Sequence, residues 1–257
     1  MKNQNALYWV TILSACTMGE TAGDFLSFGM SLGYGLSSII LIALLIVVLI
    51  LEAKAKVQNE ARYWTTIVVM STTGTAMADF LTRTLKLGYG GGSTLLTAVF
   101  VVIYFIGQKT KKTKTTSVET PIPHIKINNQ VKSLPETDAL YWAAILVAST
   151  FGTTMGDFVA DVLGFGFAMG TIFLGSLLLI VLFFEFKAKV SNKPRYWTAL
   201  VITSTIGATF GDFLTKEDGL NLGYARGMAI VVGAFVLIYL IGRTRKLASV
   251  LPHVDLE

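Results

Sequence analysis

Four aspartates recur at one spacing along the 257 residues, and their carboxylates are the groups best suited to chemistry in this chain. Each lies fifteen residues after the tryptophan of a Tyr-Trp pair and precedes a phenylalanine. The four are Asp24, Asp79, Asp157 and Asp212. Glu20 and Asp161 each add an acid one helical turn from the first and the third of them. Carboxylate oxygens bind hard cations and carry protons, so this pattern predicts a cation or proton site.

Hydroxyl groups accompany these acids, because a threonine follows each tryptophan by eight residues. The predicted oxygen ligands are Glu20, Asp24, Asp157, Asp79, Asp212, Thr17, Thr150 and Thr153, with the first three central. Histidine occurs only in polar stretches, and Cys16 is the single cysteine, so no intrachain disulfide can form. Oxygen ligands suit a proton, Na⁺, Mg²⁺ or Mn²⁺ better than zinc or copper(I). We therefore expect a bound cation or proton and predict no organic cofactor.

The bases near the acids leave two interpretations open. Asp79 and Asp212 each have a base four residues later, whereas Asp24 and Asp157 have none on their own segment. The residues at these four positions are Arg83, Lys216, Phe28 and Asp161. An uncompensated carboxylate in hydrocarbon costs about 2.5–3.5 kcal/mol. The sequence thus predicts a functional cation site around the unpaired acids, with salt bridges between helices as the alternative.

The segments that carry these side chains are apolar. Hydrophobic residues make up 53% of the chain and charged residues 14%, against roughly 25% charged residues in soluble domains. Apolar blocks of about 20 residues match the thickness of a bilayer. We predict an all-α integral membrane protein with eight transmembrane helices. They are expected at residues 6–28, 33–53, 62–84, 88–109, 139–163, 167–187, 195–215 and 222–243.

The chain is also a repeat within a repeat. Each of four copies begins with Tyr-Trp and continues through Thr-x-Gly to Asp-Phe, and a Gly-aromatic pair then opens a second apolar block. Alternate copies are the most alike, so a four-helix unit was itself duplicated. We predict a first membrane half at 1–109, a basic proline-containing linker at 110–137, a second half at 138–246 and a tail at 247–257. Since each copy crosses twice, the four copies should be parallel.

Helical periodicity groups seven small or polar positions on one face of the first helix of each copy, which predicts that this face is buried. Glycine or alanine pairs on that face have the small-xxx-small spacing of closely packed membrane helices. The glycines that open the second helices predict tight turns; they are Gly33, Gly88, Gly166 and Gly223. The Tyr-Trp pairs are typical of membrane-interface anchors.

Basic residues predict the orientation. Seventeen of the 21 Lys and Arg residues lie on one side of the expected topology, which places both termini in the cytoplasm. These bases occupy loops instead of one folded face, so we expect no nucleic-acid partner. The expected partners are the lipid bilayer and a small cation or proton. A homodimer is compatible with a bundle of this size.

The four Tyr-Trp…Thr-x-Gly-xxxx-Asp-Phe segments resemble a bacterial multi-pass membrane-protein family built from four tandem two-helix repeats of unknown function. The resemblance covers nearly the whole chain outside the linker and the tail. It implies a location in the bacterial inner membrane and the repeat architecture, and it brings no activity with it.

The residues themselves favour a secondary transporter of a small cation, with a divalent metal such as Mn²⁺ as one candidate. A proton-coupled carrier of a small organic solute and a non-transporting membrane scaffold are the alternatives. A scaffold needs a base beside every aspartate, whereas a transporter needs a hydrated cavity that reaches the aspartates. The sequence contains neither a Walker A motif nor a Ser/His/Asp set, so no enzyme activity is predicted.

Overall fold

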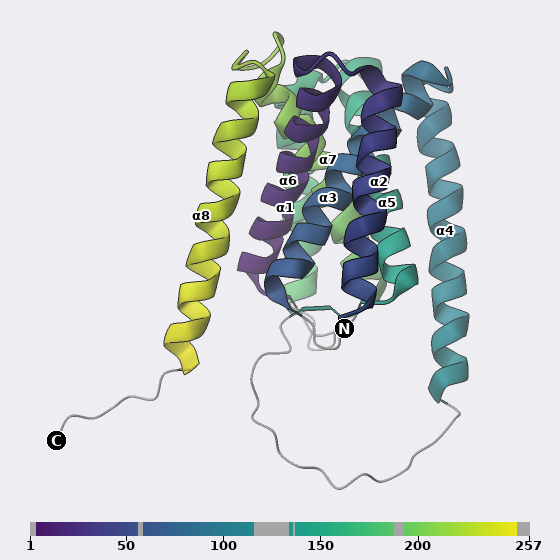
Figure 1. Cartoon of the computed structure of the whole chain (residues 1–257), viewed down its shortest axis with the longest axis vertical. Coiled ribbons are helices and arrows are strands. Elements are labelled where there is room, and N and C mark those ends of the chain that lie inside the picture. Colours follow the sequence, from purple (N-terminus) through teal and green to yellow (C-terminus); the bar gives the residue numbers. More distant parts are fainter. Residues whose placement is uncertain (1–3, 56–58, 116–133, 136, 188–192, 251–257) are drawn as a thin grey trace, which may run out of the picture.

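The computed structural model describes residues 4–55, 59–115, 134–135, 137–187 and 193–250, and the regular elements in these ranges are all helical. Eight long helices follow one another: α1 (Ala6–Asp24), α2 (Gly33–Ala53), α3 (Glu60–Asp79), α4 (Gly88–Thr115), α5 (Ala139–Asp157), α6 (Gly166–Lys187), α7 (Lys193–Thr215) and α8 (Tyr224–Val250) (Figure 1). Short π-helical turns continue α1, α3 and α5: η1 (Phe25–Gly29), η2 (Phe80–Thr84) and η3 (Phe158–Val162). The expected all-α architecture is therefore present.

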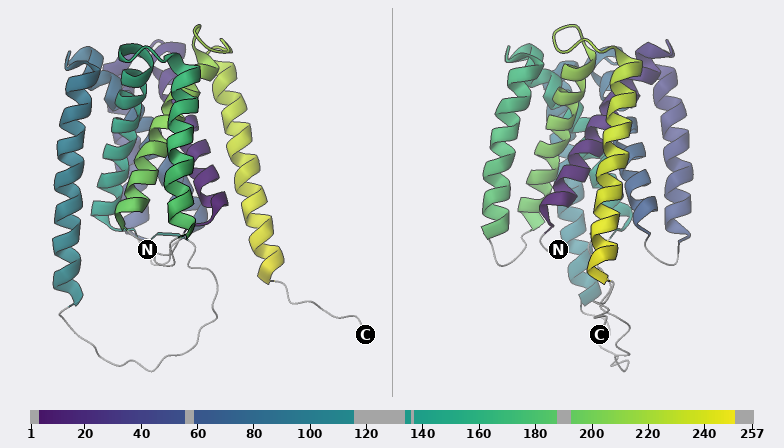
Figure 2. Two further views of the ribbon diagram at one scale, coloured as in Figure 1. Left: turned by 180° about the vertical axis from the view of Figure 1, so that it is seen from behind. Right: turned by 90° about the vertical axis from the view of Figure 1, so that its left-hand side faces the viewer.

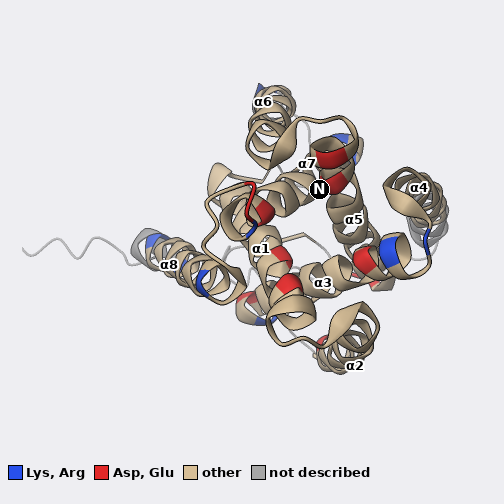
Figure 3. Cartoon of the chain, turned by 90° about the horizontal axis from the view of Figure 1, so that it is seen from above, with Lys and Arg blue, Asp and Glu red and all other residues tan. Residues whose placement is uncertain are grey.

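The helices form an inner ring and an outer layer (Figures 2 and 3). In the inner ring, α1 and α5 each pack against both α3 and α7. The second helix of each repeat then covers the first helix of the next repeat, so that α2 packs on α3, α4 on α5 and α6 on α7. The last helix, α8, packs on α1 and closes the circle. The first half of the sequence thus forms one side of the inner ring, with α1 beside α3, and the second half forms the other, with α5 beside α7.

The polar face of each inner helix is buried, as predicted. All seven small or polar positions are buried in each of the four copies. Glycine allows this close approach: a Cβ added at Gly74 would lie 2.7 Å from the Cβ of Ser149, and one at Gly152 would lie 2.7 Å from the Cβ of Ser204. The glycine of one repeat therefore receives the serine of the next. Such contacts bring helix backbones together where lipid offers no hydrophobic drive for association.

The outer helices present apolar side chains outward, with Ile39 66% and Leu179 70% exposed. Five helices are long and apolar enough to cross a membrane, and four of them are the outer helices. The five spans are Gly33–Ala53, Gly88–Gly107, Ala139–Val162, Gly166–Phe184 and Tyr224–Arg245. An apolar surface of this extent on a water-soluble protein would favour aggregation, so the helices suggest a membrane protein.

The predicted tight turns between the two helices of each repeat are confirmed. Each turn has two residues with positive φ, two positions apart, and the second is always glycine. The pairs are Ser31 and Gly33, Lys86 and Gly88, Gly164 and Gly166, and Asn221 and Gly223. Glycine adopts this left-handed conformation without the steric cost that a Cβ imposes. At the opposite ends of α1, α3 and α5, the side chains of Asn5, Asn59 and Asp138 accept backbone N–H groups as N-caps.

Some helix ends differ from the expected positions. Helix α4 continues to Thr115, past the expected end at 109, and α8 continues to Val250 instead of ending at 243. Most of the predicted linker and tail lie outside the described residues. The first helices of repeats one to three end in a π-helical turn that hydrophobic periodicity does not reveal.

Replacing Gly152 by alanine should destabilise the bundle, because the new methyl group would press against Ser204 and overpacking of this kind costs about 1–3 kcal/mol. Gly175, in α6, has open space where a Cβ would be, so Gly175→Ala is the matched control. Thermal unfolding of the two variants in detergent measures the difference. If Gly152→Ala and Gly175→Ala melt at the same temperature, the inner helices can move apart to accommodate the methyl group without loss of stability.

Candidate functional site

Four tyrosine hydroxyls form a closed ring where the N-terminal ends of the inner helices meet. The oxygen–oxygen distances are 2.8 Å for Tyr8–Tyr63, 2.7 Å for Tyr63–Tyr141, 3.0 Å for Tyr141–Tyr196 and 2.8 Å for Tyr196–Tyr8. All four side chains are buried. Each hydroxyl can donate to one neighbour and accept from the other, so the ring satisfies its own hydrogen bonds. It marks the axis of the inner ring and closes the axis at this end.

The tryptophans surround the tyrosine ring. Each tryptophan packs against the tyrosine of the preceding repeat, with ring centroids 5.7–5.8 Å apart and planes tilted by 45–49°. Trp9, Trp64 and Trp142 are buried, and Trp197 is partly buried. The prediction that these pairs are interface anchors is therefore wrong. The tyrosine hydroxyls pair with one another, and the aromatic residues form the hydrophobic core of this end.

The four aspartates gather at the opposite end of the inner ring, and two bases bridge them in pairs. Arg83 donates from Nε to Asp79 Oδ1 at 2.9 Å and from Nη2 to Asp157 Oδ2 at 3.4 Å. Lys216 Nζ lies 2.7 Å from Asp212 Oδ1 and 3.8 Å from Asp24 Oδ2.

This pairing corrects the expectation that Asp24 and Asp157 are unpaired. Neither has a base on its own helix, but the adjacent inner helix supplies one. The base of α3 reaches forward to α5, and the base after α7 reaches forward to α1. Sequence spacing reveals pairs within one helix, whereas these ion pairs depend on which helices are neighbours.

Glu20 differs from the aspartates because its partners are hydroxyls. Its Oε2 accepts hydrogen bonds from Thr153 Oγ1 at 2.7 Å and from Thr75 Oγ1 at 3.0 Å. Only 3% of the residue is exposed, and Glu20 forms no ion pair with any described residue. Helix α7 makes room for it, since a Cβ at Gly211 would lie 2.9 Å from the Cβ of Glu20. A buried carboxylate in this position needs a proton or a cation to balance its charge.

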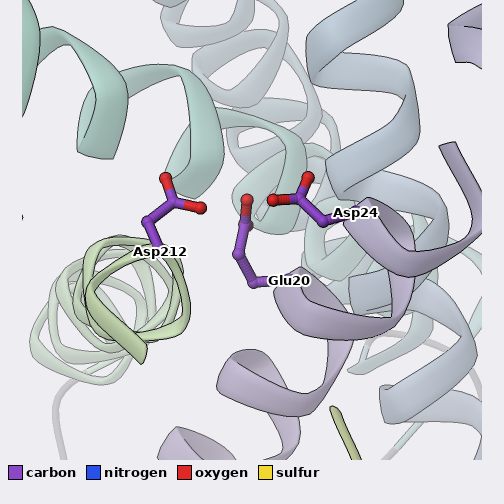
Figure 4. A group of neighbouring side chains, drawn as sticks. All are labelled: Glu20, Asp24 and Asp212. Atoms are coloured by element: carbon purple, nitrogen blue, oxygen red, sulfur yellow. The ribbon is translucent and has the colours of Figure 1, made fainter. Parts of the chain in front are cut away.

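Glu20 lies beside two of the aspartates. Figure 4 shows the carboxyl groups of Asp24 and Asp212 turned toward Glu20, and one oxygen of each of the three lies within 4.8 Å of the others. Asp24 Oδ2 is buried and accepts no hydrogen bond from the described residues, since Lys216 Nζ lies 3.8 Å from it. Oxygens that bind one ion at 2.3–2.6 Å can be up to about 5 Å apart. The three carboxylates could therefore hold one hard cation.

The structure distributes the eight predicted ligands over the inner ring. Glu20 and Asp24 lie together, Asp212 completes their group, and Asp157 joins Asp79 at Arg83. Thr153 contacts Glu20 directly. Thr17 and Thr150 are also buried, but their hydroxyls donate to carbonyls of their own helices, those of Leu13 and Leu146.

Thr75 also donates a hydrogen bond to Glu20, although it is not among the eight predicted ligands. It occupies the same position in repeat two as Glu20 in repeat one and Thr153 in repeat three, eleven residues after the tryptophan. Aligning the repeats at this position would have identified it, because residues at equivalent positions of a closed ring face one another.

Aromatic residues from the outer helices surround the two bases. The Arg83 guanidinium lies 5.8 Å from the ring centroid of Tyr34 and 5.7 Å from that of Tyr89. Lys216 Nζ lies 5.1 Å from the ring centroid of Phe167. These are three of the four Gly-aromatic pairs that open the second helices, so the repeat pattern also determines what lies over the acids.

Tyr63→Phe should lower the free energy of unfolding by about 1–3 kcal/mol, because Tyr8 and Tyr141 each lose a buried hydrogen-bond partner. Tyr239→Phe, on the outer helix α8, removes the same atom outside the ring and is the control. Thermal melting in detergent compares the two. An unchanged Tyr63→Phe variant would mean that the ring contributes no stability.

Arg83→Met should destabilise by about 3–5 kcal/mol, since it leaves Asp79 and Asp157 buried without their shared base. Arg226→Met removes the same charge from an exposed position at the start of α8. The same melting assay applies. If both variants melt at the same temperature, the aspartates do not need the guanidinium.

Comparison with known proteins identifies the repeats. The chain matches the family described as Repeat of Unknown Function (DUF347) at residues 7–57, 62–113, 140–191 and 195–246, and it belongs to this family. The predicted resemblance to a family of four tandem repeats is confirmed. No curated protein and no solved structure matches the chain.

Proposed function

We propose that this member of the DUF347 repeat family is a secondary transporter of a small cation in the bacterial inner membrane. The single observation that carries the proposal is the environment of Glu20. This carboxyl group is buried, has hydroxyl partners and no ion pair among the described residues, and faces two further carboxylates that share one lysine.

In this proposal all eight helices cross the bilayer. Five have the necessary apolar length by themselves. Helices α1, α3 and α7 are less apolar, and their polar faces, like that of α5, are enclosed by neighbouring helices. With its π-helical turn, the segment that starts with α1 covers residues 6–29, which at 1.5 Å per residue measures about 36 Å and is long enough to span.

The proposed orientation has both termini and the tyrosine ring on the cytoplasmic side. Its support is the excess of Lys and Arg in the loops on that side. The acid layer then lies toward the outer surface, and the tyrosine ring closes the axis toward the cytoplasm. A transporter of this kind would alternate between this arrangement and one in which the ring has opened.

The cation proposed is a hard one. The oxygens available at Glu20 come from carboxylates and hydroxyls, which are ligands of Na⁺, Mg²⁺, Mn²⁺ or Ca²⁺. Cys16 lies one helical turn before Glu20, and its thiol contacts the hydroxyl of Ser204. The chemistry of the site therefore favours ions that bind through oxygen.

A non-transporting scaffold is the second candidate, and the pairing of all four aspartates favours it. It does not account for Glu20, because a helix-joining role would be served at lower cost by a neutral side chain. Ala208 occupies the equivalent position in repeat four, where the bundle packs without any polar group.

The test is the thermal stability of the purified chain against Na⁺, Mg²⁺, Mn²⁺ and Ca²⁺. A ligand that binds only the folded state stabilises it, by about 2.7 kcal/mol at a hundredfold excess over Kd. We expect one of these ions to raise the melting temperature saturably and Glu20→Gln to abolish the effect. Glu52→Gln, at the cytoplasmic end of α2, removes an acid paired with Arg62 and should leave the response intact.

Flux of the same ion into proteoliposomes then separates transport from binding alone. Binding with no flux would support a scaffold with a structural ion. No selective stabilisation, together with a Glu20→Gln variant at least as stable as the native chain, would reject the cation site and favour a proton-coupled carrier of an organic solute.

A further inference from the structure

The two bases of the acid layer hold their aspartates differently. The planar guanidinium of Arg83 donates hydrogen bonds to both Asp79 and Asp157. The ammonium of Lys216 lies 2.7 Å from Asp212 Oδ1 but 3.8 Å from Asp24 Oδ2, which is beyond hydrogen-bond distance. A guanidinium fork fixes two carboxylates, whereas an ammonium is a compact charge on a flexible stem. Arg83 therefore fixes both of its aspartates, whereas Lys216 holds Asp212 closely and leaves Asp24 without a hydrogen bond from the base.

The two sides also differ in charge. Arg83 serves two carboxylates, but the lysine faces three, because Glu20 lies within 4.8 Å of Asp24 and Asp212. Charges interact strongly in surroundings of low polarity. The Lys216 side thus retains more negative charge than its own base can neutralise, and it attracts a second positive charge.

The position of Lys216 in the chain allows its ammonium to move away from the aspartates. It follows the last residue of α7 and begins the turn that, in repeat four alone, is two residues longer than in the other repeats. Helix α7 also ends without the π-helical turn found after α1, α3 and α5. The lysine side chain is 21% exposed, while those of Asp24 and Asp212 are 2% exposed, so the ammonium reaches the acids from the outer end.

We propose that the Lys216 ammonium is a tethered counter-cation that the transported cation displaces from Asp212 and Asp24. The proposal rests on the proposed function and deepens it. In the absence of substrate the lysine neutralises part of the acid group, and when a cation binds to Glu20, Asp24 and Asp212 the lysine moves toward the exposed end. The acid group is then never left without a positive charge, which would be costly inside the bundle.

This arrangement selects for a divalent cation. A monovalent ion would replace an ammonium of the same charge and gain little from the three carboxylates. A divalent ion interacts with each carboxylate about twice as strongly at the same distance. The substrate class that fits is therefore a hard divalent cation such as Mn²⁺ or Mg²⁺.

The test is the Kd of Mn²⁺ for the full chain in detergent, measured by isothermal titration calorimetry at one pH and one ionic strength. Lys216→Met removes the competitor and should bind Mn²⁺ about ten- to a hundredfold more tightly. Lys216→Arg gives this side the fork of Arg83 and should bind Mn²⁺ at least roughly tenfold more weakly. Arg226→Met removes an exposed base at the same end and should change Kd by less than about twofold.

The outcomes separate the two proposals. If the Kd of Mn²⁺ is the same in the native chain, Lys216→Met and Lys216→Arg, the lysine is a structural counter-ion and displacement is overturned. The cation site itself would stand. The same holds if Lys216→Met binds more weakly and melts normally. If Lys216→Met does not fold, the Lys216→Arg result decides alone, since it retains the charge. Failure of the native chain to bind Mn²⁺ or Mg²⁺ would overturn the cation site together with the displacement.

Discussion

Five buried carboxyl groups and two bases share one end of the inner ring, and the balance of these charges constrains the rest of the structure. Buried charges are tolerated only with partners, and each base here has to reach two helices. That requirement holds α3 beside α5 and α7 beside α1. The fifth acid, Glu20, lies outside this pairing and is stabilised by the hydroxyls of Thr75 and Thr153.

The site arises where the four repeats stop being alike. Positions that pack the helices are nearly uniform, as shown by the glycines, the tyrosine ring and the positive-φ turns. Two positions diverge in charge: one carries Glu20, Thr75, Thr153 and Ala208, and the other carries Phe28, Arg83, Asp161 and Lys216. Four identical repeats would give a symmetric ring. These differences instead make the side with Glu20, Asp24 and Asp212 more acidic than the side with Asp79 and Asp157. Repetition thus supplies the framework, and divergence supplies the chemistry.

The sequence alone was enough to identify the helices and their buried faces, because periodicity reports which side of a helix is polar. The turn glycines were also predictable, since few other residues adopt positive φ. The Tyr-Trp pairs were misplaced. An amphipathic ring at a helix end suits a membrane interface as well as a buried hydrogen-bonded ring, and a single repeat does not distinguish the two.

What only the tertiary structure decided is the partnership of the acids. Local spacing finds Arg83 for Asp79 and Lys216 for Asp212, because a base four residues later lies on the same helical face. The second partner of each base depends on the circular order of the inner helices, which no spacing within one repeat encodes. That order brings Asp212, not Asp157, to Glu20 and Asp24. The sequence therefore determined the types of the charged residues and their positions along the helices. The closure of the ring determined which of them are neighbours, since contacts across the axis exist only after all four inner helices have packed.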